Sequence, residues 1–258
     1  MGSTLSTLSS ALTKDSESAE YNGNPSERDV NAARKILLSF FPMELIDLIL
    51  DFAEFWPCIR VEGNRQIEAS ASHTISTEAT WMYLISPPIP PREIEGDSRQ
   101  RRIRKIKFDM ESHDQGSGGR QEDWGTYNGS WSWFEAMIFR PSASPCWLEF
   151  DSDPFNLSAD FNANDVKELF PEPKPNGWHV QSNIVASDTP RIHCVSWTEF
   201  AADDIHVDPT SQKGREGLGH ELVRTLLPGD KVMLIAKAKF LGWKNHVFSA
   251  SMELFYSV

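Results

Sequence analysis

The sequence feature that most constrains the fold is the alternation of apolar and polar residues in the C-terminal segment 227–258. Apolar side chains recur at every second position from Lys231 to Phe240, the chain reverses at a Gly-containing segment (242–246), and a second alternating run continues to Val258. A period of two places apolar side chains on one face of a strand and polar side chains on the other. We therefore expect an antiparallel hairpin, half buried and half exposed, in the interior of a sheet.

Short strand-like segments occupy much of the chain from Cys58 onward. They lie at 59–69, 80–86, 103–108, 131–139, 147–150, 178–186 and 191–198. Turn residues separate them, without the regular alternation of strands and helices that a parallel sheet requires. The pattern predicts a mainly β fold, namely an antiparallel β-sandwich or jelly roll with a short N-terminal helical segment. The C-terminal residues expected to face its core are Val232, Leu234, Ala236, Ala238, Phe240, Met252, Leu254, Tyr256 and Val258.

Three regions differ in composition along the chain. Residues 1–27 are rich in Ser, Thr and Asn with few large apolar side chains, so we expect a disordered tail. Residues 28–57 carry apolar side chains at helical spacing after a predicted N-cap at Ser26, which indicates a helical hairpin or a kinked helix. Residues 58–258 make up the predicted β-sandwich domain.

The start of the second helical stripe resembles a known motif. Residues 41–50 read FPMELIDLIL, which resembles the opening of an F-box, a pattern that begins Leu-Pro-x-Glu-Ile/Leu and continues to an Ile-Leu pair. The resemblance implies recruitment of a ubiquitin-ligase scaffold protein, with Pro42, Leu45 and Ile49 as partner-binding residues. The alternative is a helix that packs on the sandwich or covers one end of it, because the sequence becomes strand-like directly after Pro57.

Three further stretches resemble one group of proteins. The loop at 112–116, the segment 125–134 and the Gly242-Trp243-x-Asn245 reversal are similar to those of largely uncharacterised fungal proteins. In that group an F-box-like N-terminal helix precedes a β-sandwich of the galactose-binding-like, jelly-roll type. The resemblance implies this fold and a binding role, and it brings no catalytic residue.

Two loops carry the polar and aromatic side chains that a binding site needs. The first extends over 112–127 and places donors, acceptors and aromatic rings among several glycines; the second is the reversal at 242–246. Flat rings and convergent polar groups are typical of a sugar, peptide or small-ligand site. The alternatives are a loop whose side chains cap their own backbone and a turn anchored by its Trp. The predicted ligand-binding residues are His113, Asp114, Gln115, Trp124, Tyr127, Trp243 and Asn245.

Two weaker signals concern a metal ion and a lipid. Hard oxygen ligands for Ca²⁺ cluster at Asp203, Asp204, His206 and Asp208, although an acidic protein produces such clusters by chance. No other cofactor is expected. Gly2 with Ser6 fits the N-myristoylation pattern, and one myristoyl chain would give only weak membrane association.

Charge and composition restrict the partners and the location. The net charge of −12 argues against nucleic acid, and no apolar run is long enough to span a bilayer. We interpret the basic run 101–105 as a solvated strand edge, with a nuclear-localisation signal as the alternative. The three scattered cysteines and the absence of a signal-peptide pattern indicate an intracellular, non-secreted, cytoplasmic protein.

These observations favour a non-enzymatic binding module. It would recognise a protein, a glycan or a small ligand through the loops of the sandwich, because motifs for nucleophilic, metal-dependent or nucleotide-dependent catalysis are not found in the sequence. One alternative is an enzyme of the cyclase or isomerase type, from fungal specialised metabolism, that uses a cavity between the sheets. A second alternative is an F-box-like ubiquitin-ligase adaptor.

Overall fold

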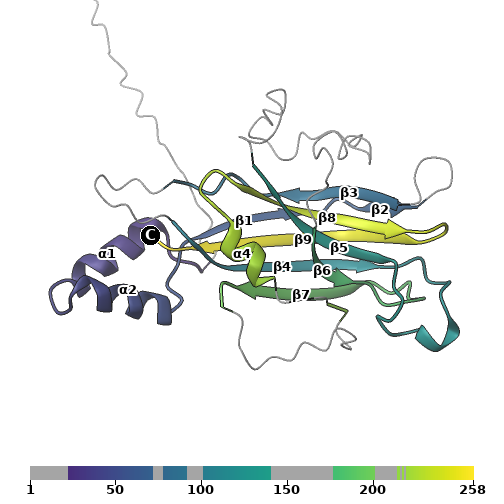
Figure 1. The fold of residues 1–258 in the computed structure, drawn as a ribbon, viewed down its shortest axis with the longest axis horizontal. Coiled ribbons are helices and arrows are strands. Elements are labelled where there is room, and N and C mark those ends of the chain that lie inside the picture. Colours follow the sequence, from purple (N-terminus) through teal and green to yellow (C-terminus); the bar gives the residue numbers. More distant parts are fainter. Residues whose placement is uncertain are drawn as a thin grey trace, which may run out of the picture.

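The computed structural model describes residues 23–71, 78–91, 101–140, 177–200, 214–215, 217 and 219–258. Two antiparallel sheets pack face to face, and two helices lie at one end of them (Figure 1). The prediction of a mainly β sandwich with short helices is therefore confirmed. The predicted strand at 147–150 lies outside the described residues. The helices are α1 (Glu27–Leu37), α2 (Met43–Phe52), α4 (His220–Thr225) and a 3₁₀ turn at Gln121–Asp123.

The order of the strands is that of a jelly roll. One sheet has the order β1 (Cys58–Gly63), β9 (Lys244–Tyr256), β4 (Ile103–His113), β7 (Arg191–Thr198), and β2 (Ile67–Ser70) also pairs with β9. The other has the order β3 (Glu78–Ile85), β8 (Lys231–Lys239), β5 (Ser132–Phe139), β6 (Trp178–Ser182). The pairs β1–β9, β3–β8, β4–β7 and β5–β6 nest inside one another along the chain. A long hairpin rolled into two layers produces this pairing.

The two C-terminal strands lie in the interior of the sheets, as predicted, but they do not form a hairpin. β9 pairs with β1, β2 and β4, whereas β8 pairs with β3 and β5 in the opposite sheet. Phe240 (φ 68°) and Gly242 (φ 86°) reverse the chain between the two layers. The prediction of a hairpin was wrong because a period of two reports which face of a strand is buried and not which strand it pairs with.

The predicted core faces of β8 and β9 are buried, with one exception. Phe240 is 45% exposed because it belongs to the reversal between the layers and not to β8. The opposite face of β8 also departs from the prediction, since Met233 and Ile235 are each 1% exposed. They belong to a second apolar cluster on the outer side of the four-stranded sheet, formed by Met82, Ile85, Met137, Phe139, Met233 and Ile235. β8 is therefore buried on both faces over part of its length.

The helical segment forms a hairpin that covers one end of the sandwich. α1 begins with a capping box in which Ser26 and Asp29 satisfy each other's backbone N–H groups. Val30, Ile46 and Leu50 belong to the same buried core as the strands, so this segment packs on the end of the sandwich. Charged contacts reinforce the junction: the Arg101 side chain forms an ion pair with Glu27 at 2.7 Å. Among the described residues, the hairpin packs on the sandwich through the side that carries Val30, Ile46 and Leu50.

A buried polar network joins the two sheets at the opposite end. Ser112 Oγ of β4 donates to Asn183 Oδ1 at 2.7 Å, and Asn183 Nδ2 donates to Asn245 Oδ1 of β9 at 2.9 Å. Asn183 Nδ2 also donates to Ser132 Oγ at 3.2 Å, and Asn245 Nδ2 donates to the Trp133 carbonyl at 2.9 Å, both on β5. Such a network fixes the register of two layers because displacing either layer leaves buried polar groups unpaired.

Candidate functional site

The predicted binding loop lies at the end of the sandwich opposite the helices, beside the reversal between β8 and β9 (Figure 1). Asp114 is completely buried at the base of this loop. Its carboxylate accepts hydrogen bonds from the backbone N–H groups of Gly116 (2.7 Å), Ala186 (2.7 Å) and Ser187 (2.9 Å). Burial raises the pKa of Asp114, and these three N–H donors act against that rise. The carboxylate therefore holds two loops together and has no open side for a ligand.

Asn245 and Trp243 also have structural roles. Asn245 is fully buried and uses its side chain to join the sheets, so it does not line a pocket as predicted. Trp243 is 8% exposed, and its carbonyl accepts a hydrogen bond from the Ala71 N–H at 3.1 Å. The Trp-anchored turn, which was the alternative for this reversal, matches the structure.

Gln115 and His113 diverge from the base of the loop. Gln115 Oε1 accepts from the Lys244 backbone N–H at 3.1 Å, which ties the loop to the start of β9. The His113 ring stacks on His246 of the neighbouring strand, with 4.7 Å between ring centroids. Burial lowers the pKa of His246, and the adjacent His113 lowers it further. His113 thus belongs to the outer surface of the five-stranded sheet.

Trp124 and Tyr127 complete the set of predicted ligand residues. Trp124 is 51% exposed, and its Nε1 donates to the Gly118 carbonyl at 2.8 Å. Tyr127 is partly buried and its hydroxyl lies 3.0 Å from His193 Nε2 on β7. The structure therefore gathers Asp114, Gln115 and Trp243 around the loop base but directs the other side chains elsewhere. Trp124 is the member of the set with a largely open aromatic ring.

His193 should make the fold sensitive to acid. Burial, together with the positive charges of Arg215 and Arg191, lowers the pKa of His193 to about 4, below an unfolded value of about 6.5. Between these two pH values, His193 is protonated in the unfolded chain and neutral in the folded chain. The contribution of His193 to the free energy of unfolding is fully present above about pH 6.5. It is lost as the pH falls towards 4, by on the order of 3 kcal/mol.

Urea unfolding at a series of pH values tests this contribution of His193. The His193→Gln variant should lose less stability than the wild type between neutral pH and about pH 4, by roughly that amount. Equal losses in the two proteins would show that other groups account for acid unfolding.

The predicted metal and lipid sites fall outside the described residues. Asp203, Asp204, His206 and Asp208 lie in one stretch of the chain that the structure does not describe, and Gly2 lies in another. Within the described ranges, no group of three or more His, Cys, Asp or Glu side chains is arranged to hold a metal ion. In the same ranges, no helix has the length and apolar character needed to cross a membrane.

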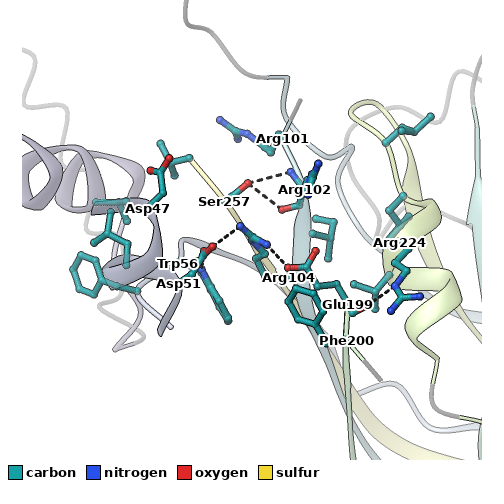
Figure 2. Close-up of a pocket in the computed structure, with 18 of the residues that line it drawn as sticks. Asp47, Asp51, Trp56, Arg101, Arg102, Arg104, Glu199, Phe200, Arg224 and Ser257 are labelled. Carbon is teal, nitrogen blue, oxygen red and sulfur yellow. Dashed lines mark hydrogen bonds and ion pairs between the residues drawn. The ribbon is translucent and has the colours of Figure 1, made fainter. Parts of the chain in front are cut away.

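A large concavity lies at the helical end of the sandwich, where the sequence predicts a partner-binding helix but no ligand pocket. It is a pocket of about 890 Å³ between α1–α2, the start of β4 and α4 (Figure 2). Five arginines line it, namely Arg34, Arg101, Arg102, Arg104 and Arg224. Three carboxylates, Asp47, Asp51 and Glu199, line it as well. In Figure 2 the Arg104 guanidinium lies between Asp51, which it contacts at 2.6 Å, and Glu199.

The basic run 101–105 is the sequence feature that contributes most directly to this pocket. This run is not the solvated strand edge that its charge pattern predicts, because β4 lies between β9 and β7 in the interior of its sheet. The Arg101 side chain is 3% exposed and that of Arg104 is 16% exposed. A run of basic residues indicates an exposed strand only where no carboxylates from other elements form ion pairs with it.

The outer side of the helical hairpin is apolar and exposed. On α2, Leu45, Leu48, Ile49 and Phe52 follow helical spacing on a face turned away from the buried Ile46 and Leu50. Phe52 is 95% exposed and Phe40, in the connection between the helices, is 73% exposed. We call the exposed large apolar side chains of the hairpin its apolar face; they are Ile36, Leu38, Phe40, Phe41, Leu45, Leu48, Ile49 and Phe52. The predicted partner-binding residues Leu45 and Ile49 belong to it, and Pro42 is the exposed N-cap of α2.

No protein-family model matches this chain, and a search of curated proteins finds no match to it. Function is therefore inferred from the geometry at the two ends of the sandwich.

Proposed function

We propose that this protein is a non-enzymatic binding module that recruits a partner protein through the apolar face of the hairpin. The observation that carries the proposal is the exposure of eight large apolar side chains on two short helices and their connection. Exposed apolar surface of this density costs solubility, and contiguous apolar patches on proteins commonly mark interaction sites. The side chains recur at the spacing by which a helix docks into an apolar groove.

The attachment of the hairpin supports the same proposal. Its inner side chains are packed into the core, and ion pairs fix it to β4, including Lys105–Glu54 at 2.6 Å. The apolar face is thus presented in a fixed orientation before a partner arrives. Preorganisation of this kind strengthens binding because little conformational entropy is lost on association.

The F-box-like sequence at 41–50 makes a ubiquitin-ligase scaffold protein the first partner to test. This hairpin supplies two helices before β1 begins at Cys58, where F-boxes use about three, so the proposed contact is a reduced version of that interface. The free, exposed thiol of Cys194 is compatible with a reducing compartment, and we extend the proposal to a cytoplasmic protein.

A second candidate is a ligand site at the loop end, where the half-exposed Trp124 ring offers a stacking surface for a sugar or peptide. We rank it second because Asp114 and Asn245, which would have supplied polar contacts, are committed to the protein's own hydrogen bonds. The enzyme alternative required a cavity between the sheets. Large side chains such as Phe108, Phe134 and Met252 fill that layer.

The double variant Leu48→Glu with Phe52→Glu tests the proposed interface. We expect the purified scaffold protein to bind the wild type and to bind this variant at least about a hundredfold more weakly, because two anchors of an apolar contact become charged. Isothermal titration calorimetry measures both affinities. Both side chains are more than half exposed, so the variant should unfold at the same urea concentration as the wild type.

The matched control is Arg28→Gln, a change at an exposed residue in the first turn of α1 that lies outside the apolar face and outside the F-box-like sequence, which should leave the affinity unchanged. Absence of binding by the wild type would contradict the scaffold as the partner. If sedimentation then shows a dimer that the double variant dissociates, the occupant of the face is a second copy of this chain. If neither association occurs, the proposed function is refuted.

A further inference from the structure

The pocket at the helical end carries a surplus of positive charge. Its lining has five guanidinium groups and three carboxylates, and a fourth carboxylate, Glu27, pairs with Arg101, so one positive charge remains in excess in a protein whose net charge is −12. The surplus therefore does not follow from composition. It arises because α1, the start of β4 and α4 each contribute arginine to the wall of one cavity. Figure 2 labels the arginines of the last two elements, namely Arg101, Arg102, Arg104 and Arg224.

Two of these arginines have no carboxylate partner among the described residues. The Arg102 guanidinium forms no ion pair there, although its backbone is held by Ser257. Arg224 donates from Nε to the Glu199 backbone carbonyl at 2.6 Å, which leaves its two terminal nitrogens directed to no described carboxylate. Both residues are exposed, so their charged groups are accessible from solvent.

The other three arginines leave buried donors unused. The Nε atoms of Arg34, Arg101 and Arg104 are buried and have no hydrogen-bond partner among the described residues. Arg101 is the most enclosed, since its terminal nitrogens pair with Glu27 and its guanidinium lies 4.6 Å from the centre of the Tyr256 ring. An unpaired buried N–H costs stability, so the protein's own acceptors do not fully satisfy the guanidinium groups that line this pocket.

Apolar side chains stand beside these charges. Phe200 is 72% exposed and Leu227 is 45% exposed, and both line the pocket. Figure 2 shows Phe200 next to Glu199, below Arg104. A ligand that covers these side chains while it contacts the arginines must have an apolar body and a negative group. The volume is in the range of about 300–1,000 Å³ that is typical for small-molecule sites.

We propose that this pocket binds a small organic anion with an apolar body. Arg102 and Arg224 hold the acidic group, and Phe200 and Leu227 contact the body. Guanidinium groups suit both carboxylates and phosphates, because planar N–H pairs match two oxygens of either group. The site is separate from the apolar face of the hairpin, so it can succeed or fail independently of partner recruitment.

Four probe compounds with related structures separate the contributions. Decanoate and decyl phosphate carry the body with a carboxylate or a phosphate, decanol carries the body alone, and inorganic phosphate carries the charge alone. We expect at least one of the two acidic amphiphiles to raise the melting temperature at about 1 mM, and to bind at least about tenfold more tightly than decanol or inorganic phosphate. The stronger of the two identifies the acidic group.

Substitution of the unpaired arginines should weaken the stronger probe. Arg102→Gln and Arg224→Gln should each lower its affinity by about tenfold, since each removes a charge-assisted contact. Arg120→Gln is the matched control, because Arg120 is 81% exposed in the loop at the other end of the sandwich. NMR signals of the arginine Nε–H groups give a second measurement that needs no variant: those of Arg34, Arg101 and Arg104 should shift when the probe is added, and that of Arg120 should not.

Three results would each overturn the proposal. The first is that decanol binds as tightly as the acidic amphiphiles, and the second is that Arg102→Gln and Arg224→Gln bind the probe like the wild type. The third is that no probe binds at about 1 mM and the Nε–H signals stay unchanged.

Discussion

Replacing Gly219 by alanine should destabilise the fold by about 4 kcal/mol, the sum of left-handed backbone strain and a steric clash. Gly219 has φ 64°, a conformation that residues with a Cβ adopt only at a cost. An added Cβ would also overlap the indole of Trp197. That ring is 4% exposed and packs edge-on against Phe108 at 5.1 Å between centroids, so it has little room to move.

Gly229→Ala is the matched control for this change. Gly229 has φ 90°, but an added Cβ would meet no atom within 4 Å. Its replacement should therefore cost only the strain of the left-handed backbone, about 1–2 kcal/mol. Urea unfolding of both variants measures the difference. Equal losses for Gly219 and Gly229 would show that Trp197 is free to move away and that the packing between α4 and β7 is loose.

Replacing Asn183 by alanine should cost about 3–4 kcal/mol, because it leaves several buried groups without partners. Ser112 Oγ would lose its acceptor, and Asn245 Oδ1 and Ser132 Oγ would lose a donor. Asn183 itself is fully buried between the two sheets. The loss should appear as a lower midpoint of urea unfolding.

The exposed Asn128 provides the control, and Asn128→Ala should change stability by less than about 0.5 kcal/mol. A double variant of Asn183 and Asn245 should lose less stability than the sum of the two single variants, since both residues serve the same network. Strict additivity would indicate that the two side chains act independently and that the network does not join the sheets.

The fold class could be predicted from the sequence because burial leaves a periodic pattern. Leu234, Ala236, Met252 and Leu254 were placed on core faces correctly, and both C-terminal strands lie in the interior of the sheets. Their assignment to opposite sheets could not be predicted. It depends on the conformation of Phe240 and Gly242, and the same residues at the same positions are compatible with a hairpin turn.

The binding site was harder to predict than the fold, because the same polar side chains can bind a ligand or form hydrogen bonds within the protein. Asp114 and Asn245 have the polar groups of a binding site, but the backbone amides and sheets of this protein use them. The pocket could not be predicted, because its lining residues are not close together in the sequence. Arg34, Arg104 and Arg224 are far apart in the sequence, and only the docking of α1–α2 and α4 against β4 brings them to one cavity.

The apolar face of the hairpin was predictable only in part. The stripe from Leu45 to Phe55 is apolar over much of the helix circumference, so the sequence predicts that something must cover it. The sandwich covers the side that carries Ile46 and Leu50 and leaves Leu48 and Phe52 open. Which half is covered follows from the docking angle of the hairpin, and side-chain spacing carries no information about that angle.

The methyl NMR spectrum of the protein, with and without the purified ligase scaffold, tests the proposed function most directly. We predict that the methyl signals of Ile36, Leu45, Leu48 and Ile49 shift or broaden on addition of the scaffold. Those of the core residues Ile106 and Leu254 should stay in place. Unchanged hairpin methyls, or changes confined to methyl groups around the Trp124 loop, would contradict recruitment through the apolar face.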